Sequence, residues 1–540
     1  MQVNVVVSSF FICTFVPSIT NKNDIKLIAK IFSATLQGLE ALTVTLEVDV
    51  QSSPQPHFSI VGLPDNAIRE SQDRVMTALN SNNYNIGVKS IIVNLSPADV
   101  KKEGSGFDLP LAIGILSSIG LINNENINKY MFVGELSLDG LIQPVKGALP
   151  IAIKARELGY DALFVPEDNA REAAVVNKLA VYGVRHIQEV LGFLNGTTCL
   201  EPTEVNTREE FYAQQSSFDF DFDEVKGQEN VKRAFEVAAA GGHNIILVGS
   251  PGCGKSMMAK RLPSILPPLS LAESLETTQI HSIAGKVKRD TSLISQRPFR
   301  APHHTISDVA LVGGGVNFMP GEICLSHNGI LFLDELPEYS KSVLETLRQP
   351  LEDRIITISR AKYNITMPCS FMLVAAMNPC PCGYHHHPTH VCTCTPAQIQ
   401  RYMNKISGPL MDRIDLQVEV EALPVEDMTK APKGESSTTI RERVIRARQI
   451  QEQRYAGIKG VHCNAQMTTA LLQKYAVLDE TSTDRLRSAM KMLNLSARAY
   501  DRILKVARTI ADLEGSENIK PYHIGEAIGY RNLDRESWIE

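Results

Sequence analysis

The stretch GSPGCGKS, residues 249–256, constrains the fold more than any other part of the sequence. It follows the apolar run IILV and precedes MMAKRLPSIL, so a strand, a glycine-rich turn and a helix are expected in that order. Backbone N–H groups of such a turn, aided by the helix dipole, bind phosphate groups. Lys255 would reach the β and γ phosphates of ATP, and Ser256 would ligate Mg²⁺. The predicted ATP-binding loop consists of Gly249, Ser250, Pro251, Gly252, Cys253, Gly254, Lys255 and Ser256.

Two more apolar strands end in polar side chains. The run ILFLDE ends at Asp334 and Glu335, and the run FMLVAAM is followed by Asn378. Taken alone, each ending is as often an ordinary strand end that meets solvent. Together with the phosphate loop they predict a catalytic set: Asp334 helps to hold Mg²⁺, Glu335 polarises the attacking water and Asn378 orients that water.

Two arginines extend this set. Arg413 stands in GPLMDRIDL, at the end of the expected nucleotide-binding domain, and Arg498 stands in LSARAYDR, at the start of a later helix. Arginines so placed can stabilise the charge that develops on a transferred phosphoryl group. From spacing alone, a surface salt bridge explains each of them equally well.

The chain has 540 residues, which is too long for one hydrophobic core, so about three domains are expected. Alternating and helical patterns predict an α/β domain at residues 30–195, and the polar, acidic segment 196–222 has the profile of a linker. A second α/β domain is expected at 223–432, followed by helices at 433–540. Residues 1–29 form a leader that we expect to be disordered or non-native. The predicted fold class is therefore multidomain α/β with a helical C-terminal domain.

Composition restricts where such a protein works. The ten cysteines are scattered, which does not resemble a secreted disulfide framework and favours a reducing, cytoplasmic location. The sequence contains no run of 18 or more apolar residues, so no membrane association is expected. The net charge is −6, and any DNA-binding surface must therefore be local.

Four cysteines cluster directly after Asn378. They occur as Cys380-x-Cys382 and Cys392-x-Cys394, with four histidines between residues 385 and 390. Four thiolates can hold a structural Zn²⁺, although the usual spacing is C-x-x-C and a histidine could replace one cysteine. Such a metal would clip a long loop beside the phosphate site. The alternatives are reduced thiols in a metal-free loop and, less favoured, redox chemistry.

Two basic segments could contact DNA. The stretch ITISRAKYNITMP predicts a hairpin with Arg360 and Lys362 at its tip, and GKVKRD at 285–290 is a basic loop. Contacts with phosphates supply most of the sequence-independent affinity for DNA. Each segment is also compatible with an ordinary solvated loop.

Several blocks carry a resemblance to a known family. The blocks FSIVGLPDNAIRES, VNLSPADVKKEGSGFDLPLAIGIL, RPFRAPHHTISDVALVGGG and PGEICLSHNGILFLDELPE resemble the ComM/YifB family of magnesium-chelatase-like AAA+ ATPases. The likeness runs from about Lys30 to the C-terminus. It implies a homo-hexameric ring ATPase that acts as a helicase on single-stranded or branched DNA. Such enzymes promote branch migration during natural transformation and recombination.

The resemblance also implies roles for particular residues. Arg413 would be the arginine finger acting on ATP of the neighbouring subunit, Arg498 the sensor in a C-terminal helical lid, and Asn378 the sensor in the core. The first domain resembles the peptidase domain of Lon proteases. In this chain Gly106 stands where the nucleophilic serine is expected, with Ser105 one place away, and Leu149 replaces the lysine. Peptidase activity is therefore disfavoured.

Two other functions remain open from the sequence. The same ATPase module drives metal insertion in chelatases, but this chain shows no metal-handling D-x-S-x-S motif. A conformational switch that hydrolyses ATP without moving DNA is also compatible with these residues.

Overall fold

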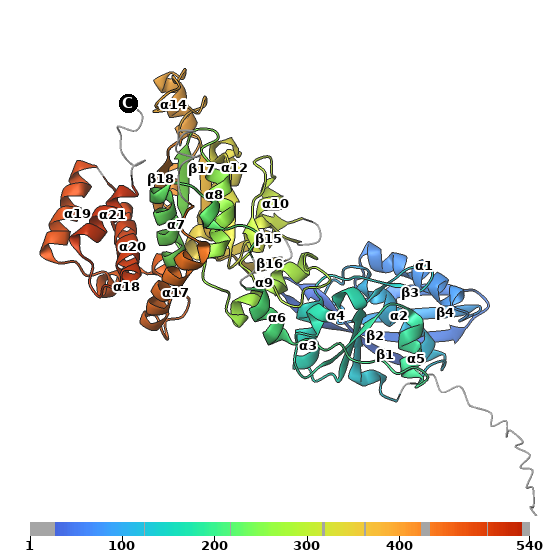
Figure 1. The fold of residues 1–540 in the computed structure, drawn as a ribbon. Coiled ribbons are helices and arrows are strands. Elements are labelled where there is room, and N and C mark those ends of the chain that lie inside the picture. Colours follow the sequence, from blue (N-terminus) through green and yellow to red (C-terminus); the bar gives the residue numbers. More distant parts are fainter. Residues whose placement is uncertain are drawn as a thin grey trace, which may run out of the picture.

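The computed structural model describes residues 28–123, 125–215, 218–315, 319–360, 363–422, 433–493 and 495–531. Two sheet-containing parts and a group of C-terminal helices follow one another along the chain (Figure 1). The predicted multidomain α/β fold is thus confirmed. Most of the predicted leader, residues 1–27, lies outside the described ranges, and the first strand begins at Ala29. Among the described helices, none has the length and apolar character needed to cross a membrane.

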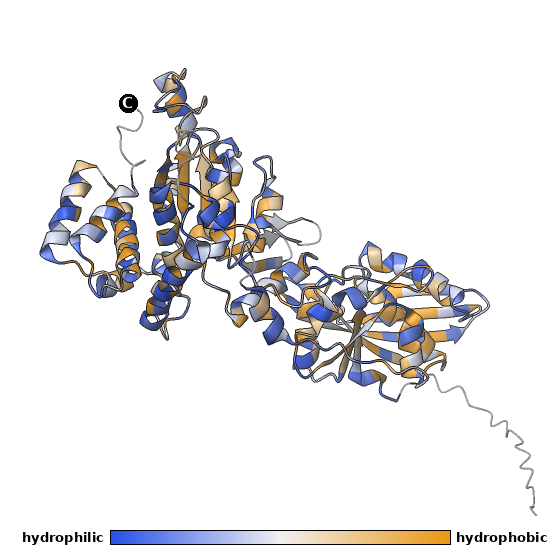
Figure 2. Cartoon of the chain, viewed as in Figure 1, coloured by the Kyte–Doolittle hydropathy of each residue, from blue (hydrophilic) through white to orange (hydrophobic). Residues whose placement is uncertain are grey.

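The N-terminal part is built on a seven-stranded mixed sheet in the order β3-β4-β2-β1-β5-β8-β9. Strand β2 buries alternate side chains, among them Val44, Leu46 and Val48, because successive residues of a strand point to opposite faces. Helix α2 covers this apolar face and is buried along nearly its whole length. Figure 2 shows apolar residues along these strands. The elements are β1 (Ala29–Gln37), β2 (Glu40–Ser52), β3 (His57–Val61), α1 (Asn66–Ser81), β4 (Lys89–Ser96), α2 (Asp108–Ser118), β5 (Tyr130–Phe132), β6 (Glu135–Leu136), β7 (Ile142–Gln143), α3 (Ala148–Glu157), β8 (Ala162–Pro166), α4 (Glu167–Ala173), β9 (Ala180–Val184) and α5 (Ile187–Leu194).

The segment predicted as a linker contains a helix, α6 (Thr207–Gln214). Asn206 caps its N-terminus, and Phe211 is its buried side chain. Glu210 forms an ion pair with Arg171 of α4 at 2.7 Å. The polar composition of the segment hid this helix, because one buried aromatic side chain produces no apolar periodicity.

The core part contains a five-stranded parallel sheet in the order β11-β14-β17-β10-β18. Strands β10, β14 and β17 are continuous apolar runs, as expected for strands that are covered on both faces. Because the strands are parallel, their carboxyl ends meet at one edge of the sheet. The elements are α7 (Glu229–Gly241), β10 (Ile245–Gly249), α8 (Lys255–Arg261), α9 (Leu271–Ile283), β11 (Phe299–Arg300), α10 (Asp308–Val312), β12 (Gly313–Gly314), β13 (Met319–Pro320), α11 (Glu322–Leu325), β14 (Ile330–Leu333), α12 (Lys341–Thr346), α13 (Arg348–Asp353), β15 (Ile355–Arg360), β16 (Tyr363–Pro368), β17 (Met372–Met377), α14 (Pro396–Met403), α15 (Gly408–Met411) and β18 (Leu416–Val420).

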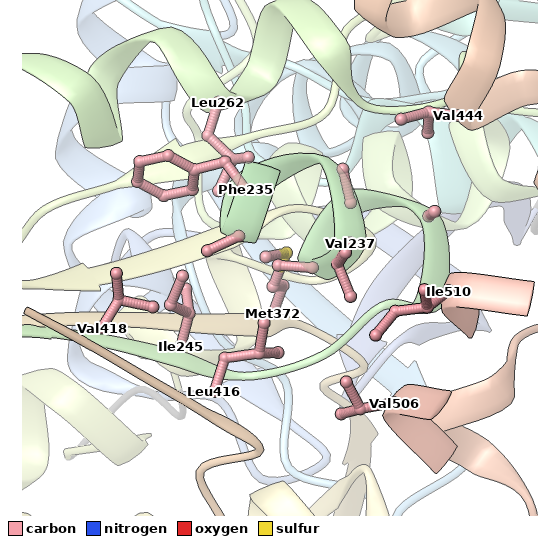
Figure 3. Packing of buried hydrophobic residues seen from close by; sticks show 14 of the residues in the cluster. Phe235, Val237, Ile245, Leu262, Met372, Leu416, Val418, Val444, Val506 and Ile510 are labelled. Atoms are coloured by element: carbon pink, nitrogen blue, oxygen red, sulfur yellow. The ribbon is translucent and has the colours of Figure 1, made fainter. Parts of the chain in front are cut away.

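The C-terminal helices share a hydrophobic cluster with the core sheet. In Figure 3, Val444 of α17 and Val506 and Ile510 of α20 lie beside residues of α7 and the sheet, such as Val237 and Ile245. All five side chains are buried. The helices therefore pack on the core sheet and α7 rather than forming an independent hydrophobic core. They are α17 (Ser437–Arg454), α18 (Thr469–Tyr475), α19 (Glu480–Met492), α20 (Ala497–Leu513) and α21 (Pro521–Gly529).

The N-terminal part contacts the core through α9. The backbone N–H of Gly147, just before α3, donates to the carbonyl of Ser282 on α9 at 3.0 Å. The buried carboxylate of Glu172 accepts from the Ser282 hydroxyl and from the Leu149 N–H at 3.1 Å. Burial raises the pKa of Glu172 above its usual value. These contacts join the two sheet-containing parts directly.

Candidate ATP site

The phosphate loop connects β10 to α8 at the carboxyl edge of the core sheet. Gly252 and Gly254 have φ values of +80° and +92°, which favour glycine. At Gly249, an added Cβ would lie 2.4 Å from the Val420 carbonyl oxygen of β18, so only glycine permits this close approach. The turn and the start of α8 therefore have the local geometry expected of a phosphate-binding loop.

Lys255 lies at the centre of this loop. Its buried ammonium donates to the carbonyls of Gly249 at 2.7 Å and Ser250 at 3.0 Å. It also donates to Oδ1 of Asn378 at 3.2 Å. A cation enclosed by a glycine-rich turn at a helix N-terminus fits the binding of an anionic polyphosphate such as ATP. Asn378, from the end of β17, is held within reach of the same group.

Ser256 and Asp334 form the second contact of the site. The hydroxyl of Ser256, on α8, donates to Oδ2 of Asp334 at 2.5 Å. Asp334 directly follows β14. A hydroxyl and a carboxylate are oxygen ligands of the kind that Mg²⁺ prefers. The donor set thus fits Mg²⁺, for which both residues are predicted ligands.

Glu335 adopts a left-handed backbone conformation with φ +53°. Its side chain is 56% exposed, and Oε2 lies 3.4 Å from Nδ1 of His304. His304 follows β11, the strand next to β14, so the pairing of these strands brings the two side chains together. His304 was not predicted as a site residue. The sequence signal that could have found it is the polar pair His303-His304 at the end of an adjacent strand.

Arg413 and Arg498 lie away from the phosphate loop of their own chain. The carbonyl of Arg413 accepts from Asn244 Nδ2 at 3.0 Å, and Asn244 precedes β10, whereas the loop follows it. The five-residue strand between them spans roughly 16 Å. Arg498 donates to Asp412, the neighbour of Arg413, at 3.2 Å. The structure therefore brings the two arginines together at the amino edge of the sheet.

Each of these arginines has a protein partner. Arg413 donates to the Pro409 carbonyl at 2.7 Å and pairs with Glu352. The Arg498 side chain is 66% exposed. Both guanidinium groups belong to a surface that is distinct from the ATP site of the same subunit.

The four clustered cysteines lie within 4.8 Å of one another, sulfur to sulfur. The Sγ of Cys380 lies 3.3 Å from that of Cys382 and 3.7 Å from that of Cys392. Tetrahedral Zn²⁺ with Zn–S bonds of about 2.3 Å requires sulfur separations of about 3.8 Å. Cys394 completes the set, and these separations fit a four-thiolate zinc site in spite of the unusual C-x-C spacing.

The cysteine loop touches the phosphate loop. Gly383 has φ +85°, and an added Cβ would lie 2.6 Å from Pro251 Cδ and 3.9 Å from Asn378 Cγ. This close approach requires glycine. The ordering of the cysteine loop is therefore coupled physically to the position of the ATP-binding turn.

The predicted hairpin is present as β15 and β16, which pair from Ile355 opposite Pro368 to Arg360 opposite Tyr363. The side chain of Arg360 and the whole of Lys362 lie outside what the structure describes. About halfway along it, Ile365 of β16, opposite Ile358, lies against Gly38 of the N-terminal part, and Figure 1 shows the hairpin between the two parts.

The second basic segment, 285–290, makes ion pairs within the protein. Lys286 lies 3.8 Å from Glu322, and Arg289 pairs with Asp168 of the N-terminal part at 2.8 Å. These contacts make the loop part of the interface between the two parts and disfavour it as a DNA contact.

The predicted peptidase positions form no catalytic pair. The Ser105 hydroxyl donates to Glu135, and Leu149 is buried in α3. The Ser105 hydroxyl and Leu149 are thus occupied by contacts within the N-terminal part.

Three segments of the chain match family models. Residues 221–428 match "Magnesium chelatase, subunit ChlI", residues 46–169 match "Subunit ChlI of Mg-chelatase", and residues 434–531 match "Magnesium chelatase, subunit ChlI C-terminal". These matches, together with the phosphate loop, support an ATPase that uses ATP and Mg²⁺.

Among curated proteins, the competence protein ComM of Haemophilus influenzae is 42% identical over 511 residues, covering 94% of this chain and 98% of that protein. The uncharacterized protein YifB of Salmonella typhimurium is 42% identical over 501 residues, covering 92% and 96%. Lon protease 2 of Bacillus subtilis is 27% identical over 122 residues, which is 22% of each chain.

Proposed function

Since this chain belongs to the ComM/YifB family of magnesium-chelatase-like proteins, we propose that it is an ATP-driven ring motor that acts on DNA. The motor is a homo-hexamer and a helicase that promotes branch migration of single-stranded or branched DNA. Support comes from the 42% identity to a competence protein over nearly the whole of both chains. Its proposed setting is natural transformation or recombination in the cytoplasm. The nine cysteines of the described residues are all free thiols, which fits a reducing compartment.

The proposed hydrolysis relies on side chains at the carboxyl edge. Glu335 accepts a proton from the attacking water, and His304 positions the Glu335 carboxylate. Asn378 orients the water, while Lys255 and the loop N–H groups bind the phosphates of the substrate ATP. Ser256 and Asp334 would hold Mg²⁺, which would supply charge neutralisation at the phosphates.

The observation that carries the ring proposal is the place of the two arginines. A strand of the sheet separates Arg413 from the phosphate loop of its own chain, so we assign Arg413 and Arg498 to the ATP site of a neighbouring subunit. A subunit with a site on one surface and the completing cations on another forms heterologous contacts, which close into a ring. In this proposal no subunit hydrolyses ATP efficiently alone.

Zinc has a supporting role in this proposal. The four cysteines would hold Zn²⁺ as a structural clip. Because Gly383 of the same loop contacts Pro251, ordering of the cysteine loop also fixes the phosphate loop. The metal fixes the excursion between β17 and α14, which would otherwise be costly to order.

DNA contact is assigned to the hairpin tip. Arg360 and Lys362 would meet strand phosphates in the bore of the ring. The hairpin precedes β17, whose end carries Asn378, so a force on the hairpin is transmitted to the ATP site through one short connection. A chelatase motor and a DNA-independent switch share the ATP site but do not need these cations.

One experiment separates these functions. ATP hydrolysis by the full chain is measured with and without forked DNA, together with displacement of a labelled strand. We expect DNA to stimulate hydrolysis and the fork to be unwound, and we expect Arg360→Ala combined with Lys362→Ala to remove only the stimulation. Hydrolysis that is indifferent to DNA would favour the chelatase or switch function instead.

A further inference from the structure

A cavity of about 130 Å³ lies at the amino edge of the core sheet, opposite to the phosphate loop. Asn244, Met372 and Asp415, which precede or begin β10, β17 and β18, line its floor. Arg448 of α17 and Arg502 of α20 line the side formed by the C-terminal helices. The cavity therefore lies where those helices meet the core.

Cations outnumber acids in its walls. The charged lining residues that are described are Arg297, Arg354, Arg448, Arg502, Glu273 and Asp415. Four arginines less two carboxylates leave an excess of two positive charges. Lys505 lies close by, and burial together with repulsion from Arg502 lowers its pKa to about 8. The surroundings are thus strongly cationic although the whole chain is acidic.

Both carboxylates already have partners. Glu273 forms an ion pair with Arg297 at 3.4 Å. Its carboxylate also accepts from the Ser270 backbone N–H in the N-terminal capping box of α9. One oxygen of Asp415 accepts from Arg502 at 2.8 Å, and the other lies 3.1 Å from Nδ1 of His243. Neither acid is therefore available to neutralise the remaining arginines.

Arg354 and Arg448 have donors to spare. A guanidinium carries five N–H donors. Within the described residues, the Arg354 guanidinium makes one hydrogen bond, from Nη1 to the Gly460 carbonyl at 3.3 Å. Arg448 donates from Nη2 to the Ala239 carbonyl at 3.0 Å, and its Nε is buried with no hydrogen-bond partner among those residues. Burial and the charge of Arg502 lower the pKa of Arg354.

Unpaired cations and unsatisfied donors are costly inside a protein, and an anion would satisfy both. The planar forks of arginine match tetrahedral oxyanions, and phosphate most of all. The cavity of about 130 Å³ equals the liquid volume of roughly four water molecules, which leaves room for one or two phosphoryl groups.

We propose that this cavity binds a small phosphoanion, inorganic phosphate or pyrophosphate, between Arg354 and Arg448. Arg354 directly precedes the hairpin strand β15, and Arg448 belongs to α17. A bound anion would therefore join the core to the C-terminal helices at the base of the hairpin. This site is separate from the phosphate loop and does not depend on the proposed DNA motor function.

Calorimetric titration of the full chain with inorganic phosphate at constant ionic strength tests the proposal. Titration is done in a Lys255→Ala background, so that the phosphate loop contributes no binding. We expect about one phosphate per chain, and we expect Arg354→Gln or Arg448→Gln to weaken binding by about tenfold or more. Arg487→Gln, an exposed arginine on α19, is the matched control and should leave binding unchanged. Loss of all binding in Lys255→Ala alone would overturn the site.

A second measurement uses the wild-type chain alone and so does not depend on how a variant folds. Crystals of the wild-type chain with tungstate should give an anomalous peak within hydrogen-bond distance of the Arg354 and Arg448 guanidinium groups. A peak at the phosphate loop without one in the cavity would contradict the proposal. Displacement of the cavity tungstate by an oligonucleotide without terminal phosphates, but not by inorganic phosphate, would assign the site to a DNA backbone and also contradict it.

Discussion

The two edges of the core sheet differ in how their polar side chains are satisfied. At the carboxyl edge, Lys255 contacts Asn378 and Ser256 contacts Asp334 within a single chain. At the amino edge, Arg413 pairs with a surface carboxylate, and other arginines line a cavity with too few acids. The carboxyl edge is thus a nearly complete site, while the amino edge needs something from outside the chain. In a parallel sheet, these two edges lie one strand length apart.

The largest effect is expected from a substitution at the amino edge. Arg413→Ala should lower kcat of ATP hydrolysis by about a thousandfold or more, because an arginine finger stabilises charge in the transition state. ATP affinity should change little, as measured by fluorescent nucleotide titration.

Arg348→Ala is the control for Arg413→Ala. Arg348 and Arg413 line the same surface pocket, and Arg348 pairs with Glu345 at 2.7 Å. It should retain most of the activity. An equal loss in both variants would indicate a general effect of surface charge.

The next largest effect is expected from a substitution at the carboxyl edge. Glu335→Gln should reduce kcat by about a hundredfold or more, since general-base assistance is removed while the shape is kept. Ring formation and ATP binding should survive, which size-exclusion chromatography with ATP would reveal. Normal turnover in this variant would refute the role of Glu335.

The sequence alone predicts the residues at the carboxyl edge of the core sheet but not the cavity at the amino edge. The phosphate loop, Asp334, Glu335 and Asn378 were predictable because parallel apolar strands end at one edge, so their last residues must converge. His304 was missed because the short strand β11 has no apolar run to mark it. The amino-edge cavity was not predictable. Its walls come from segments as distant as Arg297 and Arg502, and only the docking of the helices brings them together.

A smaller effect sharpens the link between the cysteine loop and the carboxyl edge. Cys380→Ser should lower bound zinc well below one per chain and raise the KM for ATP by about tenfold, because a supporting contact to Pro251 is loosened. Elemental analysis and kinetics measure both. Cys199→Ser, at an exposed free thiol, should change neither. Wild-type protein that is folded, active and free of zinc would disprove the clip.

The last prediction concerns stability at the amino edge. The folded chain gives up the Lys505 proton near its pKa of about 8, whereas the unfolded chain keeps it until about 10.5. Between these pH values the unfolded state binds more protons, so the free energy of unfolding should rise with pH by at most about 3 kcal/mol. Urea unfolding at pH 8 and pH 10 should show this rise in the wild type and a smaller one in Lys505→Met. Equal slopes would mean that Lys505 is not perturbed.

The central claim is that an ATP site is completed by arginines from the neighbouring subunit. Mixing Lys255→Ala subunits, which cannot bind ATP, with Arg413→Ala subunits, which lack the completing cation, tests it directly. Each variant alone should be inactive, and the mixture should recover a substantial part of wild-type ATP hydrolysis, since an intact loop then meets an intact Arg413. A mixture that stays inactive while forming mixed rings would contradict the account.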